Sequence, residues 1–247
     1  MLVHQGTSRT TRINLHLACS LAGIAGALNA AAFYSVGFFS ANMTGNVSTL
    51  SDHVATGQWR SGLFYLCIIA LFIFGSSVST LLINAGSRRA MTGVYAYSIL
   101  LEALLLTVLG TIDLWVQAVW RTPTVVLGLA FLMGLQNATV TRISDARVRT
   151  THVSGMATDI GIEIGMAFDM LRGHATQDAT AGNFSRLYLH SATIASFLAG
   201  GIVGVLIYQR LGGYLMIMAA FALLALALRG LHWTRKTAPM LQMPNDL

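Results

Sequence analysis

Six long apolar stretches constrain this chain more than any other feature of its sequence. They cover residues 13–33, 62–83, 94–114, 123–141, 187–208 and 212–228. A helix needs about 20 mostly apolar residues to cross the hydrocarbon core of a bilayer, and each stretch is close to that length. Only 10% of the 247 residues are charged, against roughly a quarter in a typical soluble domain. The sequence therefore predicts an all-α membrane protein with about six transmembrane helices.

The positions of the basic residues predict how these helices are oriented. The 15 arginines and lysines of the chain are dispersed singly or in pairs. They do not form the long basic block that is typical of a nucleic-acid-binding tail, so we expect no nucleic-acid partner. Suppose that residues 38–51 and 154–171 re-enter the membrane without crossing it. Then 12 of the 15 basic residues lie on one side, and the other three are Arg60, Arg121 and Arg210. If both segments cross, the ratio is 9 to 6. Because arginine and lysine are retained in cytoplasmic loops, we predict six crossings with both tails cytoplasmic.

The two polar segments at 38–51 and 154–171 belong to an internal repeat. GALNA at 26–30 corresponds to GLQNA at 134–138, and ANMTG at 41–45 corresponds to THVSG at 151–155. Each half of the chain then continues with two further apolar stretches. Three crossings per half is an odd number, so the halves must have opposite orientations in the membrane. We predict a 3+3 inverted repeat in which each half carries a broken or re-entrant helical segment.

The repeat divides the chain into four parts. These are a tail at 1–12, a first repeat at 13–114, a second repeat at 115–228 and a tail at 229–247. Two alternatives remain open. Residues 154–171 as one straight helix would be about 27 Å long, nearly enough to span or to lie in the interface. The first apolar stretch, which follows Arg9 and Arg12, is also compatible with a signal peptide.

Several single residues predict details of the packing. Pro123 is suited to the first position of a helix, where its missing N–H is not needed. Gly200 and Gly204 form a GxxxG pattern that allows close helix packing. Cys19 and Cys67 lie in apolar stretches, and we expect them to be packed free thiols.

Four short motifs carry a resemblance to a known family. They are GALN at 26–29, ANMTGN at 41–46, GLQNA at 134–138 and RTTHVSG at 149–155, the last followed by Thr158 and Asp159. With these motifs the chain resembles the YoaK-like family of bacterial membrane proteins over roughly residues 13–228. Ser154 stands where the family pattern usually has threonine, which keeps the hydroxyl. The family is a domain of unknown function, so the resemblance implies a multi-pass protein of the bacterial inner membrane and no substrate.

Polar residues around the two segments are candidates for binding a solute. Thr44 and Ser154 each precede a glycine and a short helical pattern, where a hydroxyl caps free N–H groups and the helix end carries a partial positive charge. Two such ends meeting near the membrane midplane would attract an anionic or strongly polar group. The alternative is ordinary capping of two interfacial helices. The predicted substrate-binding residues are Asn29, Asn42, Thr44, Asn46, Asn137, Arg149, His152 and Ser154.

A second set of residues is a candidate for binding a coupling ion or proton. It comprises Thr158, Asp159, Glu163 and Glu102. Carboxylates inside a membrane are costly, and they usually face a cavity, pair with a cation or relay protons. For Asp159 and Glu163 the alternative is a salt bridge with Arg142, Arg147 or Arg149 at the membrane surface.

Buried amides and Glu102 also have structural interpretations. Asn29, Gln136 and Asn137 lie in apolar surroundings, where an amide either bonds across helices or contacts a substrate. Glu102 lies eight residues into the third apolar stretch, and His190 is one candidate partner. The alternative is a buried, neutral carboxyl group.

Together these features predict a small transporter or permease for a polar or anionic small solute, surrounded by the lipid bilayer. Six spans are few for a transporter, which favours a homodimer. A membrane scaffold or sensor subunit is an alternative. A membrane-embedded enzyme, with His152 and Asp159 as acid and base, is less favoured because no nucleophile signature is present. The sequence contains no metal-ligand spacing. We therefore expect no enzymatic activity, no metal and no cofactor.

Overall fold

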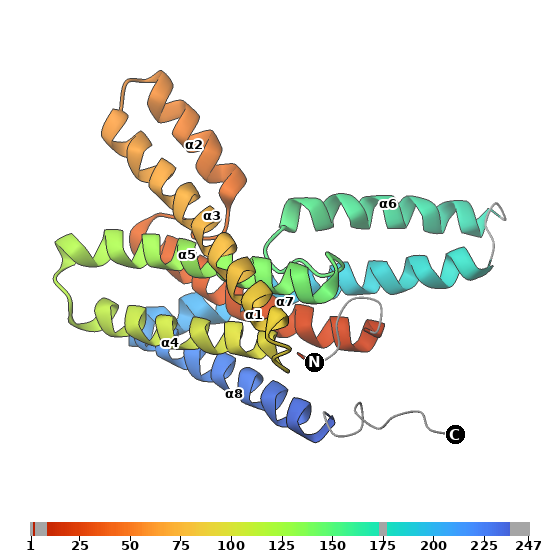
Figure 1. Ribbon diagram of the computed structural model, residues 1–247. Coiled ribbons are helices and arrows are strands. Elements are labelled where there is room, and N and C mark those ends of the chain that lie inside the picture. Colours follow the sequence, from red (N-terminus) through yellow and green to blue (C-terminus); the bar gives the residue numbers. More distant parts are fainter. Residues whose placement is uncertain (1, 3–8, 173–176, 238–247) are drawn as a thin grey trace.

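The computed structural model describes residues 2, 9–172 and 177–237, and these form eight α-helices (Figure 1). The helices are α1 (Thr11–Val36), α2 (Met43–Ala55), α3 (Trp59–Arg88), α4 (Val94–Trp115), α5 (Ala118–Ser144), α6 (Val153–Leu171), α7 (Gln177–Leu211) and α8 (Tyr214–Thr237). All except α2 and α6 contain a segment that is long and apolar enough to cross a membrane. The prediction of six apolar helices with two polar helical segments between them is therefore confirmed.

The helices divide into inner and outer ones. Of the most apolar segment of α5, 67% is buried inside the protein, against 17% for α7. The outer surface is covered by large apolar side chains. Leu81, Leu104, Leu198 and Phe221 are between 62% and 66% exposed. Large apolar side chains exposed in such number are unfavourable in water, which supports a protein surrounded by lipid.

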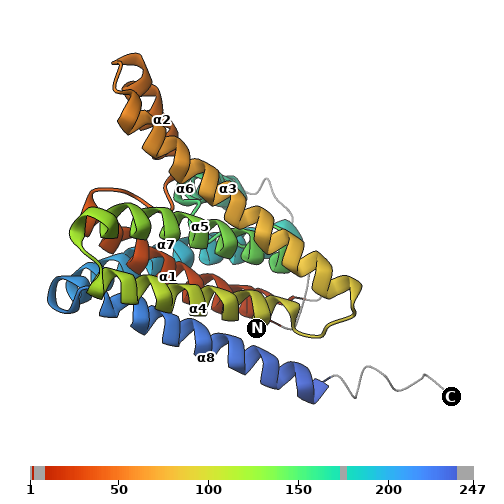
Figure 2. The same cartoon turned by 60° about the vertical axis from the view of Figure 1, so that its left-hand side comes forward.

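Three long helix pairs build the bundle, since α1 packs along α7, α3 along α5, and α4 along α8 (Figures 1 and 2). Glycines bring the backbones of the first pair together. A Cβ at Gly200 would overlap the backbone of Gly23, and one at Gly204 would overlap the backbone of Ala27. The close packing that the GxxxG pattern predicted is confirmed, and its partner is α1.

The second pair, α3 and α5, meets in the same way. A Cβ at Gly134 would overlap the Phe72 carbonyl group, and a Cβ at Gly75 would overlap that of Phe131. The Ser76 hydroxyl donates to the Gly134 carbonyl at 3.0 Å. Lipid tails are as apolar as leucine, so packing of this kind, rather than exclusion of water, holds membrane helices together.

Both ends of the described chain lie at the same end of the bundle. Leu2 packs against Gly230 near the end of α8. The Arg142 guanidinium at the end of α5 donates to Asn84 near the end of α3, at 2.6 Å. The described chain therefore runs along the bundle an even number of times. We call the end that holds Leu2, Gly230 and Arg142 the arginine-rich end.

The two short helices begin in the middle of the bundle. α1 ends where Gly37 adopts a left-handed conformation (φ 76°), a common helix end. Residues 38–42 then return along the bundle, and α2 runs outward beside α3 (Figure 1). Residues 145–152 make a similar return after α5, and α6 runs outward beside α7. The two hairpins, α2–α3 and α6–α7, project from the bundle in different directions (Figures 1 and 2).

The start of α5 differs from the prediction. We expected Pro123 to be the first helical residue, but α5 begins at Ala118 and Pro123 lies inside it. Proline cannot donate to the carbonyl four residues earlier, which here belongs to Val119. Val119 is 77% exposed, so its carbonyl lies at the open end of the helix, where the missing bond costs less than in the interior.

The glycine contacts generate a stability prediction. Gly26→Ala and Gly134→Ala place a Cβ against the backbone carbonyl groups of Phe197 and Phe72, which cannot rotate away. We expect each substitution to lower the free energy of unfolding by about 1–3 kcal/mol, as overpacking does, and thermal melts in detergent should detect the loss. Gly161→Ala is the matched control, because it lies in α6 with open space around it and should be neutral or slightly stabilising.

The position of the arginine-rich end generates a topology prediction. In a chain whose Cys19 and Cys67 are replaced by serine, cysteines at Arg88 and Arg147 should react with an impermeant thiol reagent from the same side of oriented vesicles. A cysteine at Arg210 should react from the opposite side. Labelling of positions 88 and 147 from opposite sides would contradict the six-crossing arrangement.

Candidate functional site

A cavity of about 510 Å³ lies between the beginnings of α2 and α6. Residues 41–44 line it from the first polar segment, and residues 151–155 line it from the second. Asn29, Phe72 and Phe197 contribute to its wall from α1, α3 and α7. Segments about 110 positions apart in the chain therefore meet in one space. The predicted substrate-binding residues that line this central cavity are Asn29, Asn42, Thr44, His152 and Ser154.

Buried amides hold the first polar segment in place. The Ala41 backbone N–H donates to Asn29 Oδ1 at 2.9 Å, and Asn46 Nδ2 donates to the Phe39 carbonyl at 3.1 Å. Asn42 Oδ1 accepts from the Gly45 N–H at 3.1 Å and caps α2. The first two bonds satisfy backbone groups that would otherwise be costly inside the bundle, and the third caps the exposed beginning of α2. Together they fix the start of α2 at the cavity.

The second polar segment is held by the corresponding amide of α5. Asn137 Oδ1 accepts from the Thr151 hydroxyl at 2.9 Å and from the Thr150 hydroxyl at 3.4 Å. At the other end of the connection, the Val148 N–H donates to the Ser144 hydroxyl at 3.1 Å. Residues 145–152 are thereby tied to α5 at two points, which fixes the start of α6.

The two helix beginnings give the cavity its electrostatic character. The N–H groups in the first turn of a helix have no acceptor within that helix, and the helix end carries a partial positive charge. α6 begins after His152 without any side-chain capping bond, so its first N–H groups remain available at the cavity. With the hydroxyls of Thr44 and Ser154 nearby, this surface offers donors to a polar or anionic group.

Three other predicted substrate residues lie outside the cavity wall. Asn46 and Asn137 are buried. Asn46 bonds the Phe39 carbonyl, and Asn137 accepts from the hydroxyls of Thr150 and Thr151. Arg149 lines a second cavity at the arginine-rich end. Its guanidinium also lies close to Gly155 of the central cavity, 3.6 Å from where a Cβ of that glycine would be.

Sequence reasoning missed the aromatic wall of the central cavity. Phe72 and Phe197 occupy the middle of apolar stretches, where nothing distinguishes them from phenylalanines that face lipid. The only signal is that each lies opposite a motif glycine, Gly134 or Gly26. That pairing is visible only after α1 has been placed on α7 and α3 on α5.

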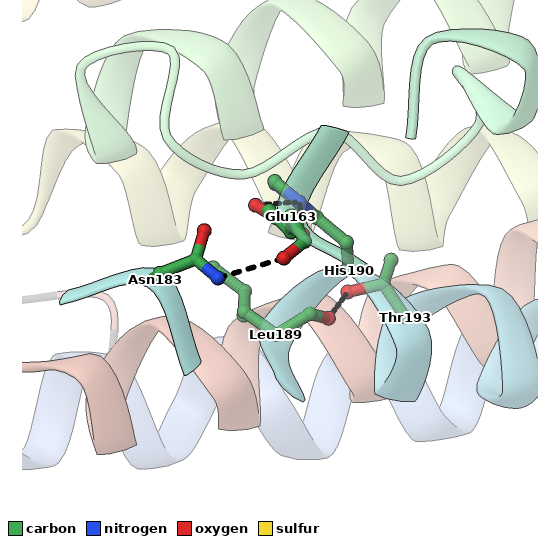
Figure 3. A network of polar contacts seen from close by, with 5 residues as sticks. All are labelled: Glu163, Asn183, Leu189, His190 and Thr193. Carbon is green, nitrogen blue, oxygen red and sulfur yellow. Dashed lines mark hydrogen bonds and ion pairs between the residues drawn. The ribbon is translucent and has the colours of Figure 1, made fainter. Parts of the chain in front are cut away.

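Glu163 has a partner that we did not predict. Its carboxylate lies 3.1 Å from His190 Nδ1 on α7, and Asn183 Nδ2 donates to its backbone carbonyl at 2.8 Å (Figure 3). The proposed salt bridges to the arginines of residues 142–149 are therefore wrong for Glu163. Because α6 packs along α7, a residue three turns into α6 faces α7 rather than the preceding loop.

The other coupling candidates are scattered. Asp159 lines the second cavity, and in the described part of the chain no ion pair joins it to an arginine. The Thr158 hydroxyl donates to the Ser154 carbonyl at 3.1 Å. In the same described residues, no group of three or more histidine, cysteine or acidic side chains could hold a metal ion, and both cysteines are free.

Glu102 pairs with an amide instead of His190. The carboxyl group is fully buried, and Gln136 Nε2 on α5 donates to its Oε1 at 3.0 Å. The suggested partner His190 is wrong, because α4 packs on α5 and α8 while α7 packs on α1 and α6. Gln136 therefore bonds across helices, as the structural interpretation of these amides proposed.

The environment of His152 generates a pH prediction. Burial, and secondly the charge of Arg149, lower the pKa of His152 from its ordinary value of 6.5. The unfolded chain then binds a proton at a higher pH than the folded protein, so stability should fall as the pH drops through about 6.5. In thermal melts, His152→Gln should lose less stability than the native chain between about pH 7.5 and about pH 5.5. His232→Gln controls for removing a histidine elsewhere, and equal losses for His152→Gln and the native chain would contradict the prediction.

Comparison with known proteins places the chain in an uncharacterised family. No curated protein and no solved structure matches it. The family model described as "Protein of unknown function (DUF1275)" matches residues 17–229, which include both polar segments and parts of all the helices. The motif resemblance to an uncharacterised family is thus supported at this level, while the name YoaK-like and the bacterial origin stay predictions. The chain belongs to the DUF1275 family.

Proposed function

We propose that the protein transports a small polar or anionic solute across a membrane by way of the central cavity. The observation that carries the proposal is that α2 and α6 begin at one cavity of about 510 Å³. Its volume lies within the range of roughly 300–1,000 Å³ that is typical of small-molecule sites. Interrupted helices whose positive ends face a common site are a recurring feature of transporters.

The proposal includes an inverted repeat, and matched contacts support it. Gly26 lies against Phe197, and Gly134 lies against Phe72; the glycines differ by 108 positions and the phenylalanines by 125. The amides at 29 and 137, again 108 apart, each hold the polar segment that follows. α1 and α5 run in opposite directions along the bundle (Figure 1), as an inverted repeat requires.

A difference between the two halves supports alternating access. Beside α2, the ring of Phe38 packs on Phe64 and Tyr65, with centroids 5.0 and 5.3 Å apart. In the repeat, His190 corresponds to Tyr65, because the two are 125 positions apart, as are Phe72 and Phe197. His190 lines the second cavity beside α6, so no aromatic cluster like that of Phe38 fills this place among the described residues. We infer a state in which the transport route is closed at the end where Phe38 packs on Phe64 and Tyr65, and open at the arginine-rich end. Because basic residues are retained on the cytoplasmic side, the open end faces the cytoplasm.

The Glu163–His190 pair is our candidate for proton coupling. It joins the re-entrant helix α6 to the long helix α7 (Figure 3), and breaking or forming it would change how the two helices pack. Paired ionisable side chains within a membrane commonly relay protons. Asp159, one turn earlier in α6, faces the adjacent cavity and is the next group in such a path.

A test that needs no known substrate is the reactivity of cysteines in the central cavity. In a chain with Cys19 and Cys67 replaced by serine, Thr44→Cys and Ser154→Cys should react with water-soluble methanethiosulfonates. The anionic sulfonatoethyl reagent should react about fivefold faster than the cationic trimethylammonium-ethyl reagent, after correction for their rates with free cysteine, because two helix N-termini favour the anion.

Ser51→Cys is the matched control, since Ser51 is an exposed serine near the other end of α2. It should show a smaller preference for the anionic reagent. Failure of both cavity cysteines to react would mean that water does not reach this space, and transport through it would be ruled out. Equal rates for the two reagents would remove the anionic preference.

A further inference from the structure

A second cavity, of about 560 Å³, lies at the arginine-rich end between the start of α1, the connection 145–152 and α7. Four arginines from three separate parts of the chain line it. They are Arg9, Arg147, Arg149 and Arg186. Asp159 is the only acidic residue among its described lining residues, so the wall carries a clear excess of positive charge.

One of the four arginines, Arg9, is buried, whereas Arg147, Arg149 and Arg186 are exposed at the cavity. Arg9 is only 5% exposed, and its Nε donates to Asn14 Oδ1 at 2.6 Å. Burial lowers the pKa of Arg9 to about 10, which leaves it charged at neutral pH. Arg147 and Arg149 sit on the connection that Ser144 and Asn137 hold at its two ends.

Among the described residues, the one acidic residue on the cavity wall does not neutralise Arg147, Arg149 and Arg186. In the described part of the chain, no ion pair joins Asp159 to Arg147, Arg149 or Arg186. The nearby Glu163 is engaged by His190 at 3.1 Å. Guanidinium groups gathered in one cavity repel one another, and the repulsion is relieved when an anion enters.

We infer that this cavity is a separate binding site for a phosphate-bearing anion. A phosphate group has several oxygens and up to two charges, and each guanidinium can bind it through two parallel hydrogen bonds. The hydroxyls of Thr11 and Ser185 at the same cavity offer further donors. The phosphate can belong to a free solute or to the headgroup of an anionic phospholipid, since the cavity lies where α1 and α7 begin. The proposed transport route opens at this same cavity, but phosphate binding here is tested without any measurement of transport.

The test uses the purified full-length chain and two probes. Inorganic phosphate is titrated at constant ionic strength against chloride, with the melting temperature as readout, because a ligand of the folded state raises it. In parallel, the protein is melted in nanodiscs of phosphatidylcholine alone and in nanodiscs that also contain phosphatidylglycerol. Arg147→Gln combined with Arg186→Gln should weaken binding at least about tenfold, since each lost charge-assisted contact is substantial. Arg88→Gln, at the same end but outside the cavity, should bind as the native chain does.

Each outcome decides the inference. Stabilisation by inorganic phosphate that the double substitution abolishes supports a free phosphate-bearing solute as ligand. Stabilisation by phosphatidylglycerol alone, abolished in the same way, supports a lipid headgroup. Stabilisation by neither probe, or stabilisation that the double substitution leaves intact, overturns the site. If the double-glutamine chain does not fold, as judged by circular dichroism, Arg147→Lys with Arg186→Lys keeps the charge and should still weaken phosphate binding by removing its bidentate contacts.

Discussion

Two buried amides, Asn29 and Asn137, make the rest of this structure possible. Each accepts a hydrogen bond from the non-helical segment that follows its helix. Inside a bundle that is surrounded by lipid, irregular backbone is tolerated only where its polar groups find partners in the protein or line a cavity. Without these amides, the Ala41 N–H and the hydroxyls of Thr150 and Thr151 would lose a hydrogen-bond partner inside the bundle. The helices α2 and α6 would then not begin at a common cavity.

Close helix packing provides the frame in which the amides act. Gly26 and Gly200 bring α1 and α7 together, and Gly75 and Gly134 do the same for α3 and α5. In both pairs a phenylalanine carbonyl lies where a side chain would otherwise be. The phenylalanine rings at 72 and 197 then reach the cavity wall. The same contacts that hold the helices together therefore also shape the cavity between the two polar segments.

The two ends of the bundle have different chemistry although the helix pairs are alike. At one end the side chains beside α2 form an aromatic cluster around Phe38. At the other end the side chains beside α6 leave a basic cavity, and Glu163 pairs with His190 across α6 and α7 (Figure 3). The two ends of the bundle therefore differ in polarity and in charge. This asymmetry is why we assign separate roles to the central cavity and to the arginine-rich cavity.

The sequence by itself determined the six apolar helices and the two polar segments, because hydrophobic length and local capping patterns can be read along the chain. It also predicted Asn29, Asn42, Thr44, His152 and Ser154 as site residues, and the tertiary structure brings these to one cavity. It did not determine partners. His190 was one candidate partner of Glu102 but pairs with Glu163, and Pro123 lies inside a helix that it was expected to begin. The aromatic wall at Phe72 and Phe197, and the gathering of Arg9 with Arg147, Arg149 and Arg186, were decided only by the tertiary structure. A linear pattern reports how each residue relates to its neighbours in the chain, whereas a pair or a cavity depends on which helices pack together and in what register.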